Sequence, residues 1–105
     1  PLLPSHASYA LAQRQMRGGS GVVSVELAGG SDAARAFVER LRLFALAPSL
    51  GGVESLVMYP SSLSRMTDAQ RLASGISPSL VRLAVGVEDL DDLVEDLRSA
   101  LGGPK

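Results

Sequence analysis

The chain contains no cysteine, no tryptophan and a single histidine, His6. Without cysteine it can form no disulfide, no thiol nucleophile and no thiolate metal site, and one histidine cannot assemble a histidine-rich metal site. Lysine is almost as scarce, because nine of the ten basic residues are arginine and the only lysine is the last residue, Lys105. Any chemistry that needs an amine inside the fold therefore has no candidate upstream of that residue.

A basic excess and long apolar runs are also missing. Ten basic residues stand against eleven acidic ones, for a formal charge of -1, whereas a nucleic-acid-binding groove needs positive charge to displace counterions. No apolar run approaches the roughly 18 residues that suggest a membrane-spanning helix, and no signal-peptide pattern is present. We therefore expect a cytoplasmic protein that binds neither nucleic acid nor membrane. The start at Pro1, without an initiator methionine, suggests a fragment or a processed product.

The chain does contain enough apolar material for one modest core. It has 105 residues, of which 46% are hydrophobic and only 4% aromatic, so a core of mainly Leu, Val and Ala is expected. No linker of domain size interrupts the chain, and residues 1–105 are therefore predicted to form a single domain. Only the tail at 102–105 is expected to fray.

Apolar periodicity and capping residues divide this domain into helices and strands. In chain order, the expected elements are a helix between Ser5 and about Arg17, a strand over 22–27, a helix capped by Ser31, a strand over 43–47, a strand over 53–59, a short helix capped by Thr67 that ends at 73 or 74, a strand over 80–87 and a helix that begins near Glu88. The last helix is expected to bury a stripe of Leu90, Leu93, Val94, Leu97 and Leu101.

After the opening helix, the order β-α-β-β-α-β-α predicts an α+β fold, in which a small, mostly antiparallel sheet carries helices on one face. The core of this order matches a ferredoxin-like split βαβ unit. One functional hypothesis is therefore a stand-alone amino-acid-binding or dimerisation module without catalysis.

Arg82 is the most informative single residue, because a strand centre rarely carries a guanidinium unless that group is paired. Its same-face neighbours Ala84 and Gly86 are too small to cover the surface, which leaves room for a carboxylate to approach in bidentate geometry. An edge-exposed arginine paired with a nearby acid is the alternative, and the strand pattern leaves it open.

Ser49 opens a loop, Ser49-Leu50-Gly51-Gly52, between two expected strands. Its hydroxyl and the loop N–H groups could contact a substrate, although an ordinary turn has the same composition. The loop lacks the spacing and the lysine of a Walker phosphate loop.

The remaining polar and sulfur-containing residues are predicted to be structural. His6 is expected at the surface or as a helix cap, and the acids from Glu88 to Asp96 are expected on a solvated helix face, where they complement the helix dipole rather than bind a metal. The methionines Met16, Met58 and Met66 are expected to fill the core or an interface. No serine–histidine–aspartate triad is indicated.

Several segments, in consecutive order, together resemble the C-terminal domain of the Cys/Met-metabolism PLP-dependent enzymes. This family contains the cystathionine γ-synthases, the cystathionine γ- and β-lyases, the methionine γ-lyases and the O-acetylhomoserine sulfhydrylases. The segments are Leu3-Pro4-Ser5-His6, Arg14-Gln15-Met16, Gly21-Val22-Val23-Ser24, SLGGVESL at 49–56, Pro60, Gly75-Ile76-Ser77 and LVRLAVGVED at 80–89. The resemblance covers nearly the whole chain.

The resemblance implies a role for each of the two candidate residues. Arg82 would bind the α-carboxylate of an amino-acid substrate, and Ser49 would lie beside the catalytic lysine and the substrate. The implied cofactor is pyridoxal 5'-phosphate (PLP), held by a larger N-terminal domain that this chain lacks, and the implied assembly is a homotetramer. The implied reaction is elimination or replacement at Cβ or Cγ of a sulfur amino acid or homoserine ester.

The chain departs from the family pattern at two places. Pro48 stands where members that handle cystathionine often have Glu, and Ser64-Arg65 stands where the family has a Thr-His pair. The choice of substrate therefore does not follow from the resemblance. A PLP enzyme also needs a lysine to hold its cofactor. Because only Lys105 is present, the 105 residues are expected to contain no catalytic, cofactor-binding or metal-binding residue and to be inactive alone.

Overall fold

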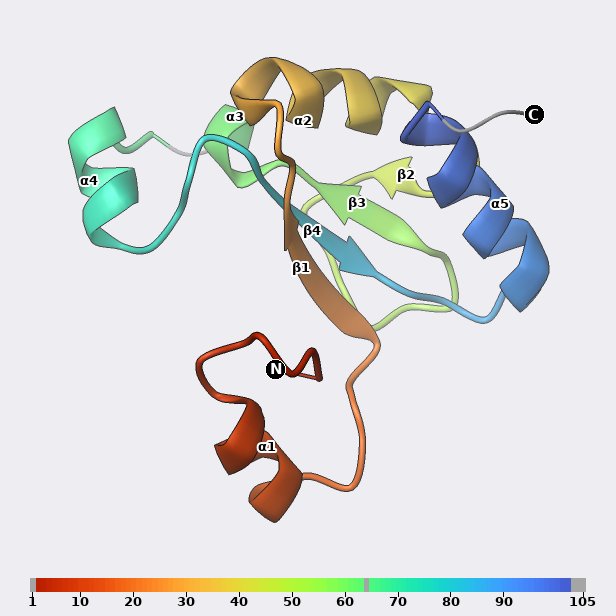
Figure 1. The fold of residues 1–105 in the computed structure, drawn as a ribbon. Coiled ribbons are helices and arrows are strands. Elements are labelled where there is room, and N and C mark those ends of the chain that lie inside the picture. Colours follow the sequence, from red (N-terminus) through yellow and green to blue (C-terminus); the bar gives the residue numbers. More distant parts are fainter. Residues whose placement is uncertain (1, 64, 103–105) are drawn as a thin grey trace.

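The computed structural model of the chain describes residues 2–63 and 65–102 (Figure 1). The elements are α1 (Tyr9–Gln15), β1 (Val22–Glu26), α2 (Gly30–Arg40), β2 (Ala45–Leu46), β3 (Leu56–Met58), α3 (Pro60–Leu63), α4 (Asp68–Ala73), β4 (Leu80–Ala84) and α5 (Leu90–Ala100). The part of the tail at 103–105, which includes Lys105, lies outside the described residues, as does Ser64.

The four strands form one mixed sheet in the order β1-β4-β3-β2. β4 pairs antiparallel with both β1 and β3, whereas β2 pairs parallel with β3. Figure 1 shows α2 and α5 side by side over one face of this sheet, and α1 set apart from it. The α+β class and the predominance of antiparallel pairing agree with the prediction.

The ferredoxin-like arrangement is not observed. In a split βαβ unit one strand separates the two strands that a helix connects, but here both β4 and β3 lie between β1 and β2. Three residues of β4, Val81, Leu83 and Ala84, are buried. The internal place of β4 pairs its buried backbone groups with a neighbouring strand along both edges.

The core lies between the sheet and the two long helices. Val57, Val81 and Leu83 of the sheet are buried against Phe37 of α2 and Leu93 of α5. Since neighbouring strand residues face opposite sides, Arg82 lies on the face of the sheet away from these helices. In α2, Ala34 and Phe37 are buried, and the N-cap is Gly29 rather than the predicted Ser31.

The predicted stripe of α5 is only partly correct. Leu93 is buried and Leu97 is half-buried, but Leu90, Val94 and Leu101 are exposed. Asp96 and Ala100 take the buried positions instead. The buried face of α5 therefore follows the residues at 93, 96 and 100, a spacing of three and four, and it includes one carboxylate.

The element boundaries differ from the predicted ones mainly by being tighter. The strands expected at 43–47, 53–59 and 80–87 shorten to β2, β3 and β4. Pro60, expected only to end a strand, also begins α3, where its missing N–H has no cost. The capping box at Thr67 and Gln70 is confirmed, with both reciprocal hydrogen bonds present. The last helix begins at Leu90 rather than near Glu88, because Asp89 is its N-cap.

Within the described residues, none of the helices has both the length and the apolar character needed to cross a lipid bilayer.

Candidate functional site

Arg82 lies at the middle of β4, opposite Ser24 of β1 and Met58 of β3. Because β4 has hydrogen-bonded neighbours on both sides, Arg82 is not on an edge strand. Among the described residues no carboxylate forms an ion pair with it. The alternative of an edge arginine paired with a nearby acid is therefore wrong on both counts.

The guanidinium of Arg82 is held by the loop that connects β2 to β3. Its Nη2 donates hydrogen bonds to the carbonyl oxygens of Pro48 and Ser49, at 3.1 Å each. Its Nε is buried and has no hydrogen-bond partner among the described residues. Since an unsatisfied buried donor costs about 1–3 kcal/mol, an acceptor that reached Nε would stabilise the guanidinium.

Ser49 contacts Arg82 through its backbone carbonyl, and the residue itself is exposed. The structure therefore brings the two predicted site residues together, although they are 33 positions apart in the sequence. The loop turns at Gly51, whose φ of 76° lies in the left-handed region that glycine adopts without strain.

The far end of the same loop is closed by Ser55, which is fully buried. Its N–H and its hydroxyl donate to the two carboxylate oxygens of Glu88, at 2.7 Å each, and its Oγ accepts from the N–H of Gly86 at 2.9 Å. Glu88 was predicted to lie in the solvated first turn of the last helix, and that prediction is wrong. Glu88 precedes the N-cap of α5, so its side chain turns back to the loop. The polar Ser55 within the expected strand at 53–59 was the only local signal of this contact.

The hydrogen bonds from Ser55 lower the pKa of Glu88, the one from the backbone N–H most and the one from the hydroxyl next. Donors that point at a carboxylate favour its ionised form. The depressed pKa means that the loop closure contributes stability above the unfolded glutamate pKa of about 4.3 and loses it as the pH falls through the folded pKa.

We therefore expect the hydrogen-exchange protection factor of the Ser55 amide to stay constant at neutral pH and to fall only below the ordinary glutamate pKa. The amide of Val57, in the core of β3, serves as the internal reference. Loss of protection at Ser55 that begins above the ordinary glutamate pKa would contradict the assigned role of the carboxylate.

Gly86 permits this closure because the loop backbone passes directly over it. A β-carbon at Gly86 would lie 2.6 Å from Oε2 of Glu88 and 2.7 Å from the carbonyl carbon of Glu54. Such distances force the backbone to move. We expect Gly86→Ala to lower the free energy of unfolding by about 1–3 kcal/mol, as measured by urea denaturation.

Gly52→Ala is the matched control for this substitution. A β-carbon at Gly52 would meet only the amide nitrogen of Glu54, at 4.0 Å. We expect it to change the free energy of unfolding by less than about 0.5 kcal/mol, as for other exposed positions. Equal effects of the two substitutions would show that close approach at Gly86 is not the cause.

Asp96, on α5, is the second acid that departs from the prediction of a solvated acidic face. It is buried, and its carboxylate accepts hydrogen bonds from the backbone N–H groups of Arg42, Leu43 and Phe44. This carboxylate therefore satisfies the donors of the segment between α2 and β2, and its role is structural.

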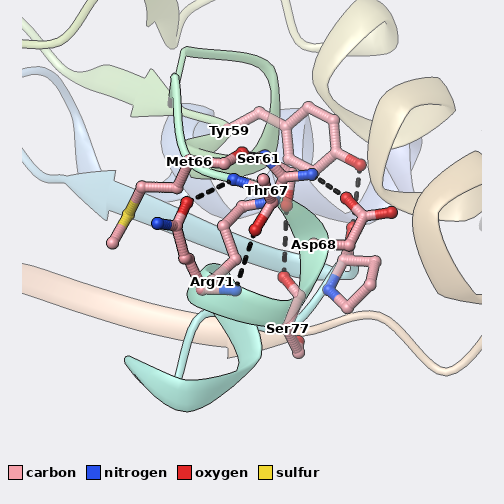
Figure 2. A network of polar contacts seen from close by, with 9 residues as sticks. Tyr59, Ser61, Met66, Thr67, Asp68, Arg71 and Ser77 are labelled. Atoms are coloured by element: carbon pink, nitrogen blue, oxygen red, sulfur yellow. Dashed lines mark hydrogen bonds and ion pairs between the residues drawn. The ribbon is translucent and has the colours of Figure 1, made fainter.

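A further polar cluster lies around α4 and the segments on either side of it (Figure 2). Arg71 forms an ion pair with Asp68, the hydroxyl of Tyr59 donates to the carbonyl of Pro78 at 2.8 Å, and Ser61 donates to the carbonyl of Ser77 at 3.3 Å. A cavity of about 630 Å³ adjoins this cluster, and Arg35 and Glu39 of α2 also line it. The hydrogen bonds of Tyr59 and Ser61 tie the segment after α4 to the body of the domain.

His6 and the methionines have no polar role in the candidate site. Nδ1 of His6 accepts a hydrogen bond from the N–H of Ser8 at 3.0 Å, next to the start of α1. Met16 and Met66 are exposed, and Met58 is half-buried beside Arg82. Within the described part of the chain, no group of three acidic or histidine side chains could hold a metal ion.

The comparisons with known proteins agree with one another. Residues 1–102 match the sequence model of the family described as Cys/Met metabolism PLP-dependent enzyme. The chain is 46% identical over 103 residues to a cystathionine gamma-lyase of Dictyostelium discoideum, covering 96% of this chain and 27% of that protein. It is 48% identical over 103 residues to an L-methionine gamma-lyase of Pseudomonas deceptionensis, covering 96% of this chain and 26% of that protein.

A solved structure gives the same result for the fold. The cystathionine gamma synthase of Xanthomonas oryzae pv. oryzae, crystallised in complex with cystathionine, superposes with a TM-score of 0.84 at 50% identity. The match covers 97% of this chain and 27% of that one. The chain thus spans about a quarter of the length of the proteins it matches.

Proposed function

Because the chain belongs to the Cys/Met metabolism PLP-dependent enzyme family, we propose that it is the C-terminal substrate-binding domain of a trans-sulfuration enzyme. In this proposal the domain packs on an N-terminal PLP-binding domain of the same protein, and the whole enzyme is a homotetramer. The reaction is elimination or replacement at Cβ or Cγ of a sulfur amino acid or homoserine ester. The names of the relatives, which include a lyase and a synthase, support this range and do not narrow it.

The observation that carries the proposed role of the domain is the buried Nε of Arg82, which has no hydrogen-bond partner among the described residues. The two loop carbonyls occupy Nη2, so the guanidinium keeps its Nε and Nη1 N–H groups for another acceptor. A substrate α-carboxylate is a suitable acceptor, because its negative charge complements the guanidinium. Ser49, whose carbonyl contacts Arg82, would lie beside the bound amino acid.

A PLP enzyme needs a lysine amine for its cofactor, and the described residues of this chain include no lysine. In the proposal, the PLP site therefore lies in the N-terminal domain. When bound, PLP supplies the electron sink for chemistry at the substrate Cα. This chain would contribute the binding and orientation of the carboxylate end of the substrate.

A stand-alone amino-acid-binding or dimerisation module is the second candidate. It is not favoured, because the relatives are lyases and synthases about four times as long as this chain. The order of the strands also removes the ferredoxin-like arrangement that first suggested it.

The proposal can be tested by comparing the 105-residue chain with the full-length protein in the presence of PLP. We expect the full-length protein to show the visible absorbance of lysine-bound PLP and to turn over a sulfur amino acid. The isolated chain should show neither signal. Stoichiometric PLP binding and turnover by the isolated chain would refute the proposal that the PLP site lies in the N-terminal domain.

A further inference from the structure

We propose that Ser55 and Glu88 are positioning residues for the carboxylate site, although neither of them contacts Arg82. They close the far end of the loop whose near end supplies the two carbonyl groups that hold the guanidinium. This inference rests on the proposed function, and it assigns to the Ser55–Glu88 contact a role in substrate affinity in addition to its role in stability.

Ser55 joins three parts of the domain at one buried point. Its carbonyl accepts a hydrogen bond from Ala45 of β2 at 3.0 Å, while its N–H and hydroxyl donate to Glu88. Its Oγ also accepts from Gly86. Every polar group of Ser55 is therefore paired, and the residue links β2 to the segment that follows β4.

The loop backbone between Ala47 and Ser55 is held in place mainly at its two ends. Residues 48–52 are exposed, and among the described residues their backbone makes no hydrogen bond apart from those that Arg82 donates. Ala47 anchors the near end through its bond to Val57, and Ser55 anchors the far end. Val53 adds one further hydrogen bond, which its carbonyl accepts from the N–H of Val87 at 3.0 Å.

The position of the Arg82 guanidinium depends on the position of this loop. When the far end is released, the carbonyls of Pro48 and Ser49 are held mainly from the near end, and the guanidinium is oriented less firmly. A substrate carboxylate must then immobilise the arginine side chain on binding, which costs affinity. We expect a rise in KM of roughly 3- to 10-fold, with kcat unchanged within about twofold because the reacting atoms are not contacted.

Glu88 has a matched control in Glu54, which lies on the same loop. The side chain of Glu54 is exposed and makes no hydrogen bond in the described structure. The other acid close to Glu88 in the sequence, Asp89, points to the N-terminus of α5, where it accepts from Asp91 and Asp92. Glu54→Gln therefore removes a nearby charge without opening the loop.

The test measures steady-state kinetics and hydrogen exchange in the full-length holoenzyme. Glu88→Ala and Ser55→Ala should raise KM for the amino-acid substrate as stated and speed exchange of the amides at 49–54. Binding of the corresponding amine, which has no carboxylate, should be unchanged. Glu54→Gln should alter none of these. Glu88→Gln, which keeps the shape of the side chain, gives a milder change in the same direction should Glu88→Ala not fold.

Two results would overturn the inference. Faster exchange at 49–54 with an unchanged KM would show that the loop is tied for stability alone, and the proposed function would stand because it depends on Arg82. An equal loss of affinity for the amino acid and the amine would show that the effect does not pass through the carboxylate site. An unchanged KM in Arg82→Ala is the separate result that would overturn the proposed function, and this inference with it.

Discussion

Arg82→Ala is expected to weaken binding of the amino-acid substrate to the full-length enzyme by about 30- to several-thousand-fold, and to leave PLP binding unchanged. This range corresponds to the roughly 2–5 kcal/mol lost when one partner of a buried, hydrogen-bonded charge pair is removed. The reason is that the guanidinium is already fixed by Pro48 and Ser49 and has a buried Nε without a partner. The measurement is the KM for the amino acid together with the dissociation constant for PLP.

Two further variants separate geometry from charge. Arg82→Lys keeps the positive charge but loses the planar guanidinium. Its affinity for the amino-acid substrate should therefore lie between those of the wild type and Arg82→Ala. Arg98→Ala removes an exposed arginine on α5 that pairs with Glu95, and it should leave KM unchanged. An equal loss of amino-acid and PLP binding in Arg82→Ala would contradict the assignment.

Asp96→Ala is expected to lower the free energy of unfolding by about 2–5 kcal/mol. The substitution leaves the N–H groups of Arg42 and Leu43, each 2.9 Å from the carboxylate, without their acceptor. It also loosens the backbone next to Phe44, whose side chain belongs to the core. Chemical denaturation measures the loss, and hydrogen exchange of the amides at 42–44 localises it.

Asp92→Ala is the control for Asp96→Ala. Asp92 lies one turn earlier on the same helix and is exposed. Its removal costs only its interaction with the helix dipole, about 0.3–1 kcal/mol. Should the amides at 42–44 keep their protection in Asp96→Ala, the carboxylate would not be what holds that segment.

The sequence-based prediction succeeds where the information is local. Alternation along 80–84 correctly places Arg82 on the face opposite Val81 and Leu83, and Thr67 with Gln70 correctly marks a helix start. The resemblance to the family, which the comparisons bear out, supplied the hypothesis for Arg82 and Ser49. Neither source could show that the link between these two residues is a backbone carbonyl, because that contact joins positions 33 apart.

The prediction fails where a side chain's partner is distant in the sequence. Glu88 and Asp96 have the spacing of solvated acids near a helix start, yet one closes a loop through Ser55 and the other caps a segment 54 residues away. The place of β4 between β1 and β3 is also non-local. Periodicity describes which face of an element is apolar, and it does not describe which backbone donors that face will meet.

The most direct test of the account compares two ligands and two proteins. The affinity of the full-length enzyme for an amino-acid substrate and for the amine that lacks its carboxylate is measured in the wild type and in Arg82→Ala. We predict that the wild type prefers the amino acid by about 30-fold or more and that this preference nearly disappears in Arg82→Ala. A preference of the same size in both proteins would show that another residue binds the carboxylate.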